Sequence, residues 1–521
     1  MRVALCPGSS QDAAPRESHS QTGRDPTATA LGLVLAFLCL RLALAAILGF
    51  SVDESYTIGN ARDLQLSYFD HPPLHYWIVW AFEPVLGEGH AARLPFVALF
   101  AGSSWLLYLL TRRLFGAWAG VWAVLALNLS FYFTIGAGSF VLPDGPLDFC
   151  LLAAALTLAN ACFADADPPS PWRTWVLAGI WIGLAALSKF QAVLFGLGVL
   201  LYLATVPRRR RLLRHPAPWV GGAIALALFS PVVIWNARHG WVTFAYQGGR
   251  GLPRDGLHIG NALVDLAGQV AWLTPWVFVP LAMACWPALR AGRAQERTWF
   301  CICLGLPAIV LFAMTPLWGD RGLPHWPMPG WLMLFPILGD YLDRRAGEAR
   351  TWRWAVTSAA LLVGLGAIVG GHAVTGFGKL WVPDLLKHDP TLEAVEWTPL
   401  VAEIKARGYL DRKDLLVIAP HWIDGGRIAQ ALGGRLPVIV AGGGEPKNFA
   451  FRSDPTSYLG HDALIIGRTM EPWMETALRP YFQSVEELPP FSFGRSGLKE
   501  IELHIMLAKD LQKPLPTYYA R

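Results

Sequence analysis

The chain has 521 residues, of which 54% are hydrophobic and only 16% are charged, and it contains 24 Trp. This composition is too apolar and too poor in charge for an ordinary soluble protein, so it predicts a polytopic α-helical membrane protein. The net charge of +5 does not indicate nucleic acid as a partner, because the Arg residues fall in short clusters between apolar segments, where they act as topology signals. The Cys residues show no zinc-site spacing, and we expect them to pack inside the protein.

The N-terminal part, residues 1–27, is rich in Ser, Asp, Arg, Gln and Pro and lacks the apolar run of a signal peptide. We expect a disordered cytoplasmic leader there, followed by an uncleaved first membrane helix. The apolar pattern then predicts a transmembrane domain over residues 28–375 with about eleven helices. They are expected near 29–50, 91–111, 118–136, 146–163, 174–188, 190–206, 217–235, 267–289, 298–315, 325–342 and 354–372.

The positions of Arg decide how these segments are counted. If each segment crosses once, every Arg cluster, such as Arg208–Arg211, falls in a cytoplasmic loop, as the positive-inside rule requires. This count needs a break at Lys189, because a single long helix there would place that cluster outside. After Gly371 the hydropathy falls, and residues 380–521 alternate short β runs with helical stretches. They predict a small α/β domain on the outer, periplasmic face.

The first outer loop holds ionisable residues that are costly to keep near lipid without a partner or a task. Asp53 and Glu54 are adjacent, and a carboxylate there could remove a proton from an acceptor hydroxyl. The alternative is a helix cap, since Asp and Ser at the start of a helix satisfy free backbone N–H groups. Asp70 and His71 precede two prolines, which stiffen the chain into a polar turn. That turn could also be plain punctuation before a helix that begins at Leu74.

Later loops bring more polar side chains to the same outer side. Asp144 lies between Pro143 and Gly145 at the mouth of a helix, where it is either functional or an N-cap. Lys189 is a cation on the side that the positive-inside rule keeps poor in cations. It predicts a contact with a lipid phosphate or, alternatively, snorkelling to the interface. Further outer-loop residues are Arg238, His239, Arg250 and His325.

In chain order, these loops contain the sequences DES, YFDHPPLHYW, LPDGPL, GLAALSKFQAVL, SPVVIWNARHGWVTF and PHWPMPGW. This order resembles the bacterial dolichyl-phosphate-mannose protein mannosyltransferase-like glycosyltransferases, which have the glycosyltransferase C-type (GT-C) fold. Relatives include ArnT, the aminoarabinose transferase of lipid A, and the rhizobial galacturonosyltransferases. The resemblance covers residues 29–372 and is weaker in the C-terminal domain.

The resemblance implies roles for individual residues. Asp53 matches the proposed catalytic base, with Glu54 as its neighbour, and Asp144 matches an acidic loop residue that we add to the catalytic set. Lys189 matches the cation for the lipid phosphate. His71 stands where the family motif often has Lys, a departure that bears on whether this position carries a permanent cation. The residues assigned to substrate binding are Tyr56, Asp70, His71, Lys189, Arg238, His239, Arg250 and His325.

The implied activity is transfer of a sugar from a polyprenyl-phosphate donor to an acceptor hydroxyl at the outer face of the bacterial inner membrane. Because a phosphate leaving group needs only a base and a cationic clamp, a single displacement would invert the anomeric carbon. The sugar is left open, as is the acceptor, which is lipid A or another lipopolysaccharide core glycolipid, an envelope glycan or a protein. The motifs indicate no metal site or other cofactor, and they leave open whether a divalent ion assists. The competing class is a transporter or flippase of a lipid-linked substrate, which predicts ionisable groups near the membrane midplane.

Overall fold

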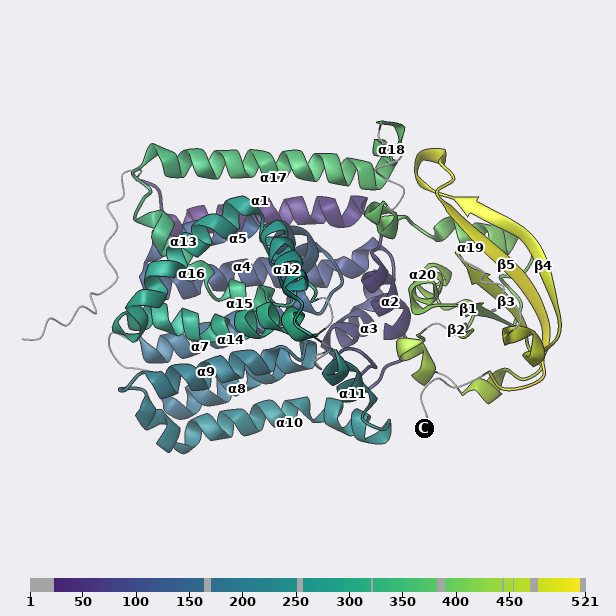
Figure 1. Cartoon of the computed structure of the whole chain (residues 1–521), viewed down its shortest axis with the longest axis horizontal. Helices are drawn as coiled ribbons and strands as arrows, with labels where there is room; N and C mark the ends of the chain where they lie inside the picture. The colour runs from purple at the N-terminus through teal and green to yellow at the C-terminus, as the bar shows by residue number, and fades with distance from the viewer. Residues whose placement is uncertain are drawn as a thin grey trace, which may run out of the picture.

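The computed structural model describes residues 23–163, 170–250, 256–319, 322–381, 389–442, 445–452, 454–468 and 477–515. Most of the helices form a bundle with roughly aligned axes, and a smaller domain with a β-sheet lies at one end of this bundle (Figure 1). The expected leader, residues 1–27, lies almost wholly outside the described residues.

The first half of the bundle starts with α1 (Pro26–Ile47), whose N-cap residue Asp25 accepts hydrogen bonds from two backbone N–H groups. Two short helices, α2 (Val52–Ala61) and α3 (Leu74–Leu86), lie at the end of the bundle next to the sheet domain (Figure 1). The elements that follow are η1 (His90–Arg93), α4 (Leu94–Phe115), α5 (Ala117–Asn128), the π-helix η2 (Tyr132–Gly136), α6 (Ala137–Ser139), α7 (Asp144–Cys162), α8 (Pro171–Ser188), α9 (Ala192–Thr205), η3 (Arg210–Arg214) and α10 (Pro216–Arg238).

The second half of the bundle returns several times between the two ends and leads into the sheet domain (Figure 1). Its elements are α11 (Val242–Gly249), α12 (Ile259–Leu273), α13 (Pro275–Ala291), η4 (Gly292–Ala294), α14 (Glu296–Trp318), α15 (Met328–Leu332), α16 (Phe335–Asp343), α17 (Ala349–Thr375) and α18 (Gly378–Trp381).

Six helices in the described residues are long and apolar enough to cross a membrane, or up to eight if each bent helix pair is one span. In one pair, α5 meets η2 and α6 at 86°, and the π-helical turn of η2 interrupts the regular pattern there. In the other pair, α12 meets α13 at 105°, where Thr274 has a φ of 69° and Pro275 begins the new helix. The chain is thus a polytopic helical membrane protein, but the expected count of about eleven membrane helices is not confirmed.

The break that the sequence predicts at Lys189 is present. α8 ends at Ser188 and α9 begins at Ala192, and Lys189 between them has an extended backbone. The two helices also have different neighbours, since α8 packs against α7 and α10 whereas α9 packs against α14. They are therefore two helices rather than one long one.

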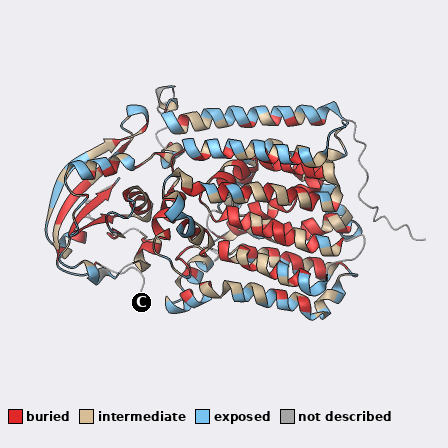
Figure 2. Ribbon diagram, turned by 180° about the vertical axis from the view of Figure 1, so that it is seen from behind, coloured by how far each residue is buried: buried red, intermediate tan, exposed pale blue. Residues whose placement is uncertain are grey.

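The outer helices of the bundle carry many exposed residues, whereas the inner helices are largely buried (Figure 2). In α17, for example, Val356, Val363 and Ile368 are exposed. A soluble protein rarely exposes so continuous an apolar surface, but contact with lipid tails requires it. The exposure pattern thus agrees with the membrane assignment.

The C-terminal domain is built on a mixed sheet of five strands in the order β2-β1-β3-β5-β4. The strands β2, β1 and β3 are parallel, and β5 pairs antiparallel with β3 and β4. Every residue of β1 and β3 is buried, as is typical of parallel strands covered on both faces. The elements are η5 (Pro390–Ala394), α19 (Thr398–Ala406), β1 (Leu415–Ala419), α20 (Trp422–Leu432), β2 (Val438–Val440), η6 (Lys447–Phe451), η7 (Pro455–Tyr458), β3 (Asp462–Gly467), η8 (Arg479–Tyr481), β4 (Phe482–Phe493), η9 (Arg495–Gly497) and β5 (Ile501–Leu511).

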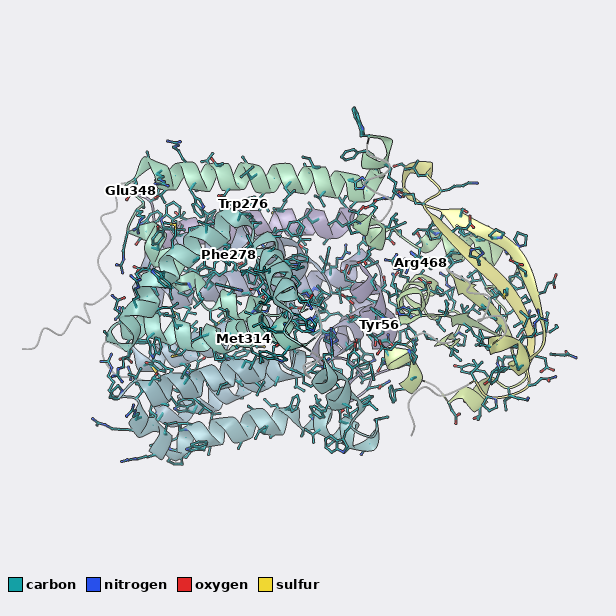
Figure 3. The ribbon with its side chains drawn as sticks, in the orientation of Figure 1. Tyr56, Trp276, Phe278, Met314, Glu348 and Arg468 are labelled. Carbon is teal, nitrogen blue, oxygen red and sulfur yellow. The ribbon has the colours of Figure 1, made fainter. Side chains whose placement is uncertain are left out.

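The two domains share one hydrophobic core where α2 packs against α20. Glycines allow these helices to approach closely. A Cβ atom on Gly426 would lie 2.9 Å from the Cα of Tyr56, and a Cβ on Gly59 would lie 3.0 Å from the Cβ of Ala429. Tyr56 therefore lies at the junction between bundle and sheet domain (Figure 3).

Candidate active site

The start of α2 separates the adjacent carboxylates Asp53 and Glu54. Ser51 caps the helix in a capping box, in which its hydroxyl accepts the Glu54 N–H at 3.3 Å and Glu54 Oε2 accepts the Ser51 N–H at 3.0 Å. Glu54 is fully buried and accepts two hydrogen bonds from the Arg93 guanidinium, both 2.7 Å long. The backbone N–H of Val141 donates to the same carboxylate at 3.0 Å. Both oxygens of Glu54 are thus occupied, and we correct its assignment from a catalytic to a structural residue.

Asp53 has a different environment. It is exposed, yet the protein that surrounds it desolvates the carboxylate and raises its pKa, while the charges of Lys447 and His71 oppose that rise. The Asp53 carboxylate is therefore both accessible and partly desolvated. A raised pKa is also what a general base near neutral pH requires. The helix-cap alternative is not supported for Asp53, because Ser51 caps α2.

Asp70 is buried and holds three partners. Tyr56 donates its hydroxyl to Oδ1 at 3.2 Å, while Lys447 Nζ and His71 Nδ1 lie 3.3 and 3.5 Å from Oδ2. Burial would raise the pKa of Asp70, but the charges and hydrogen bonds of Lys447 and His71 outweigh it and hold the pKa well below its usual range. Asp70 is therefore a fixed anion that organises the cations around it.

A second carboxylate–lysine pair lies where α7 begins. Lys189 Nζ donates to Asp144 Oδ1 at 2.8 Å, and the Tyr132 hydroxyl donates to the same oxygen at 2.6 Å. Asp144 does not cap α7, which has no side-chain cap hydrogen bond. The Lys189 side chain is only 8% exposed, so it is held inside the protein rather than snorkelling to the interface. Ser188 donates to the carbonyl of Pro143 at 2.6 Å and ties the end of α8 to the loop before α7.

Both pairs belong to one electrostatic environment. Lys189 and His71 each influence the pKa of Asp53, and together with Asp144 they influence that of His325. Burial and the charge of Lys189 lower the pKa of His325 to about 3. The imidazole of His325 is therefore neutral at physiological pH. Residues that are far apart in the sequence thus converge on one site.

The remaining residues that the sequence assigned to binding lie in different positions. The Arg250 guanidinium lies over the ring of Trp326, 4.7 Å from its centroid, and its charge also acts on His325. Arg238 is exposed on the last turn of α10, and in the described part of the chain it forms no ion pair with the site carboxylates. His239 stacks on Trp235 with ring centroids 4.1 Å apart. The charge of Arg250 thus acts on His325, whereas His239 contacts aromatic rings and Arg238 is exposed at the end of α10.

Sequence reasoning missed Lys447, which comes from η6 of the C-terminal domain. Besides its contact with Asp70, its Nζ lies 3.5 Å from the ring centroid of Trp422. Trp422 follows β1 and Lys447 follows β2, and these strands are parallel. Residues that follow parallel strands gather at one edge of a sheet. The Gly-rich segment that follows β2 in the sequence could therefore have indicated that residues near it contribute to the site. Within the described ranges, no group of three or more His, Cys, Asp and Glu is placed to hold a metal ion.

Comparison with known proteins finds a matching family model and a curated relative. The family model described as dolichyl-phosphate-mannose-protein mannosyltransferase matches residues 70–235. The lipid A galacturonosyltransferase RgtD of Rhizobium johnstonii is 24% identical over 276 residues, which are 51% of this chain and 55% of that protein. The chain thus spans about half the length of this curated relative.

Two crystal structures of ArnT from Cupriavidus metallidurans are similar over nearly the whole chain. The structure bound to undecaprenyl phosphate has a TM-score of 0.65 at 16% sequence identity and covers 92% of this chain and 97% of that one. The apo structure has a TM-score of 0.62 at 16% identity and covers 91% and 98%. Similarity at this level of identity concerns the fold.

Proposed function

We propose that this chain, a glycosyltransferase of the GT-C type that is similar to ArnT, transfers a sugar from a polyprenyl-phosphate donor to an acceptor hydroxyl, with inversion at the anomeric carbon. The observation that carries the proposal is the accessible Asp53 carboxylate, whose pKa is raised by desolvation and is influenced by two lysines that are each held by a buried carboxylate. A base beside fixed cations supplies both needs of the reaction, removal of the acceptor proton and stabilisation of the departing phosphate.

In the proposed step, the acceptor oxygen attacks the anomeric carbon from the face opposite the phosphate. The new C–O bond forms as the bond between the anomeric carbon and the phosphate oxygen breaks, and its electron pair leaves with the phosphate. Asp53 takes the hydroxyl proton. The products are the glycosylated acceptor and the polyprenyl phosphate. Because the donor carries its own leaving group, no covalent nucleophile on the protein is needed, and inversion follows.

The other site residues have positioning or binding roles in this proposal. Lys189 binds the phosphate, and Asp144 positions its ammonium group through their 2.8 Å hydrogen bond. Arg250 adds a second cation on the same side of the site. His325, which is neutral because its pKa is about 3, exchanges hydrogen bonds with sugar hydroxyls without adding charge.

We further propose that the site faces the periplasm and that the chain spans the bacterial inner membrane. Glu348 precedes α17 in an Arg-rich turn and lies at the far end of the bundle from Arg468 of the sheet domain (Figure 3). The positive-inside rule assigns Arg-rich turns to the cytoplasm and therefore assigns the sheet domain to the other side. The position of the site at one end of the bundle does not favour a transporter or flippase, whose ionisable groups lie near the midplane.

A glycolipid of the lipid A type is the acceptor that we propose, since the curated relative is a lipid A galacturonosyltransferase. The test compares envelope glycolipids, by mass spectrometry, from cells that express the wild-type chain, Asp53→Asn or no such protein. Wild-type cells should contain a glycolipid heavier by one sugar. Asp53→Asn should lower its amount by a factor on the order of 10² to 10⁴, which is the usual contribution of a positioned base.

Glu83→Gln is the matched control, because Glu83 is an exposed carboxylate on the neighbouring helix α3. This variant should make the product at the wild-type level. Asp53→Asn protein that is folded, inserted in the membrane and as active as the wild type would refute the assignment of Asp53 as the base. If wild-type cells contain no glycolipid or glycoprotein that is absent without the chain, the proposed transfer itself is refuted.

A further inference from the structure

We propose that Lys447, which belongs to the C-terminal domain, binds the phosphate of the polyprenyl donor, so that the active site is complete only when this domain is docked on the bundle. The inference rests on the proposed function and adds a residue to its donor site. It starts from the position of Lys447 at the junction of the two domains, where η6 meets the polar turn at Asp70 and His71.

The ammonium group of Lys447 keeps capacity for a ligand. Its Nζ lies 3.3 Å from Asp70 Oδ2 and faces the ring of Trp422, and its side chain is 12% exposed. A lysine ammonium has three N–H donors, and the single carboxylate contact uses one of them. The ring face of Trp422 attracts the ammonium group and fixes its position, but this contact does not use all of its N–H donors. At least one donor therefore remains for a phosphate oxygen.

The charge of Lys447 also acts on the proposed base. Among the cations that influence the pKa of Asp53, Lys447 has the largest effect, ahead of His71 and Lys189. A donor whose anomeric carbon reaches Asp53 therefore brings its phosphate near this group. His71, which also contacts Asp70 Oδ2, carries an imidazole, which is not a permanent cation. Lys447 supplies a permanent positive charge at this position.

The backbone around Lys447 is held in a specific conformation. Lys447 has a φ of 47°, in the left-handed region that residues with a side chain seldom adopt. The next residue, Asn448, fixes this turn on the bundle: its N–H donates to the Tyr56 hydroxyl at 3.0 Å and its side chain donates to Asn60 at 3.2 Å. Asn448 also accepts the N–H of Phe69 at 3.1 Å. These contacts with α2 and with Phe69, the residue before Asp70, fix the backbone next to Lys447.

A purely structural role for Lys447, as an ionic link between the domains, makes a different prediction. The same segment offers a matched control, since Arg452 forms a second ion pair across the junction, with Asp63 of the bundle. Removing either cation takes one ion pair from the interface. Of these two cations, only Lys447 is expected to contact the donor phosphate. Lys447→Met and Arg452→Met therefore separate docking of the domains from binding of the donor.

The test measures binding of undecaprenyl phosphate to the full-length chain in lipid nanodiscs, together with thermal unfolding of each variant. Wild type should bind the lipid. Lys447→Met should weaken binding on the order of 10- to 100-fold, the value of one charge-assisted hydrogen bond, whereas Arg452→Met should bind within about twofold of wild type. Adding His71→Lys to Lys447→Met returns a permanent cation to the turn and should restore part of the lost affinity.

Each contrary result has a distinct meaning. If Lys447→Met binds the lipid as the wild type does, or if Arg452→Met loses as much affinity, Lys447 does not bind phosphate and the inference is refuted. If the wild type binds inorganic phosphate as tightly as undecaprenyl phosphate, the site is not one for a lipid donor. If the wild type binds no undecaprenyl phosphate at all, the proposed function is refuted, and not merely the role of Lys447.

Discussion

Replacement of Lys189 by Met is expected to reduce both stability and transfer, and a second substitution can separate the two effects. Lys189 Nζ donates to Asp144 at 2.8 Å, and the two side chains are only 8% and 6% exposed. In Lys189→Met, Asp144 stays buried, and among the described residues the Tyr132 hydroxyl is the hydrogen-bond partner that remains to it. Removing one member of a buried ion pair costs about 3–5 kcal/mol of stability, because the other charge is left uncompensated.

The double variant Lys189→Met with Asp144→Asn removes that uncompensated charge. The oxygen of the introduced amide can still accept the hydrogen bond from Tyr132, and the methionine side chain fills much of the volume of the lysine stem. The free energy of unfolding should therefore return to within about 1–2 kcal/mol of the wild type. Transfer should stay low by a factor on the order of 10², since the group that stabilises the departing phosphate is missing from both variants.

The assay is unfolding of the purified protein in mixed micelles with increasing dodecyl sulfate, combined with the amount of modified glycolipid in cells. Two results would contradict the reasoning. Wild-type stability of Lys189→Met would mean that the pair is not buried as described. Recovery of transfer together with stability in the double variant would mean that Lys189 serves only to neutralise Asp144 and does not bind phosphate.

Two further predictions concern residues outside the donor site. Glu54→Gln should destabilise the protein by about 3–5 kcal/mol, because the fully buried Arg93 loses its charged partner; wild-type stability with loss of transfer would instead return Glu54 to the catalytic set. In the C-terminal domain, burial would raise the pKa of Asp389. Hydrogen bonds from Thr391 and Arg495 outweigh this effect and lower the pKa to about 2. Since this pKa lies below the unfolded value of about 3.9, the carboxylate contributes stability above that pH and loses it as the pH falls towards 2. The melting temperature should therefore fall over this range in the wild type and fall less in Arg495→Met, and equal slopes in both would contradict the assignment.

Much of the architecture follows from properties that each segment of sequence carries by itself. Apolar segments between Arg-rich loops predicted the bundle, and the break at Lys189 followed from the Arg208–Arg211 cluster, which the positive-inside rule places in the cytoplasm. The β runs after residue 380 predicted the α/β domain that forms most of the described C-terminal part. The ordered motifs indicated a resemblance to a family of glycosyltransferases, and the comparisons find similarity to proteins of the same kind. The prediction that Asp53 and Lys189 share one site came from the topology and the family resemblance, and the charge of Lys189 acts on the pKa of Asp53 in the structure.

Other features depended on contacts between segments that are distant in the sequence. The adjacent Asp53 and Glu54 look equivalent as a dipeptide, and only the packing of Arg93 against α2 buries one of them and leaves the other accessible. Lys447 reaches Asp70 because the Gly-rich faces of α2 and α20 allow the sheet domain to approach closely. Hydropathy and charge are local quantities that sequence alone can reveal. Which side chain meets which partner depends on how the helices pack, and this is decided only when the tertiary structure forms.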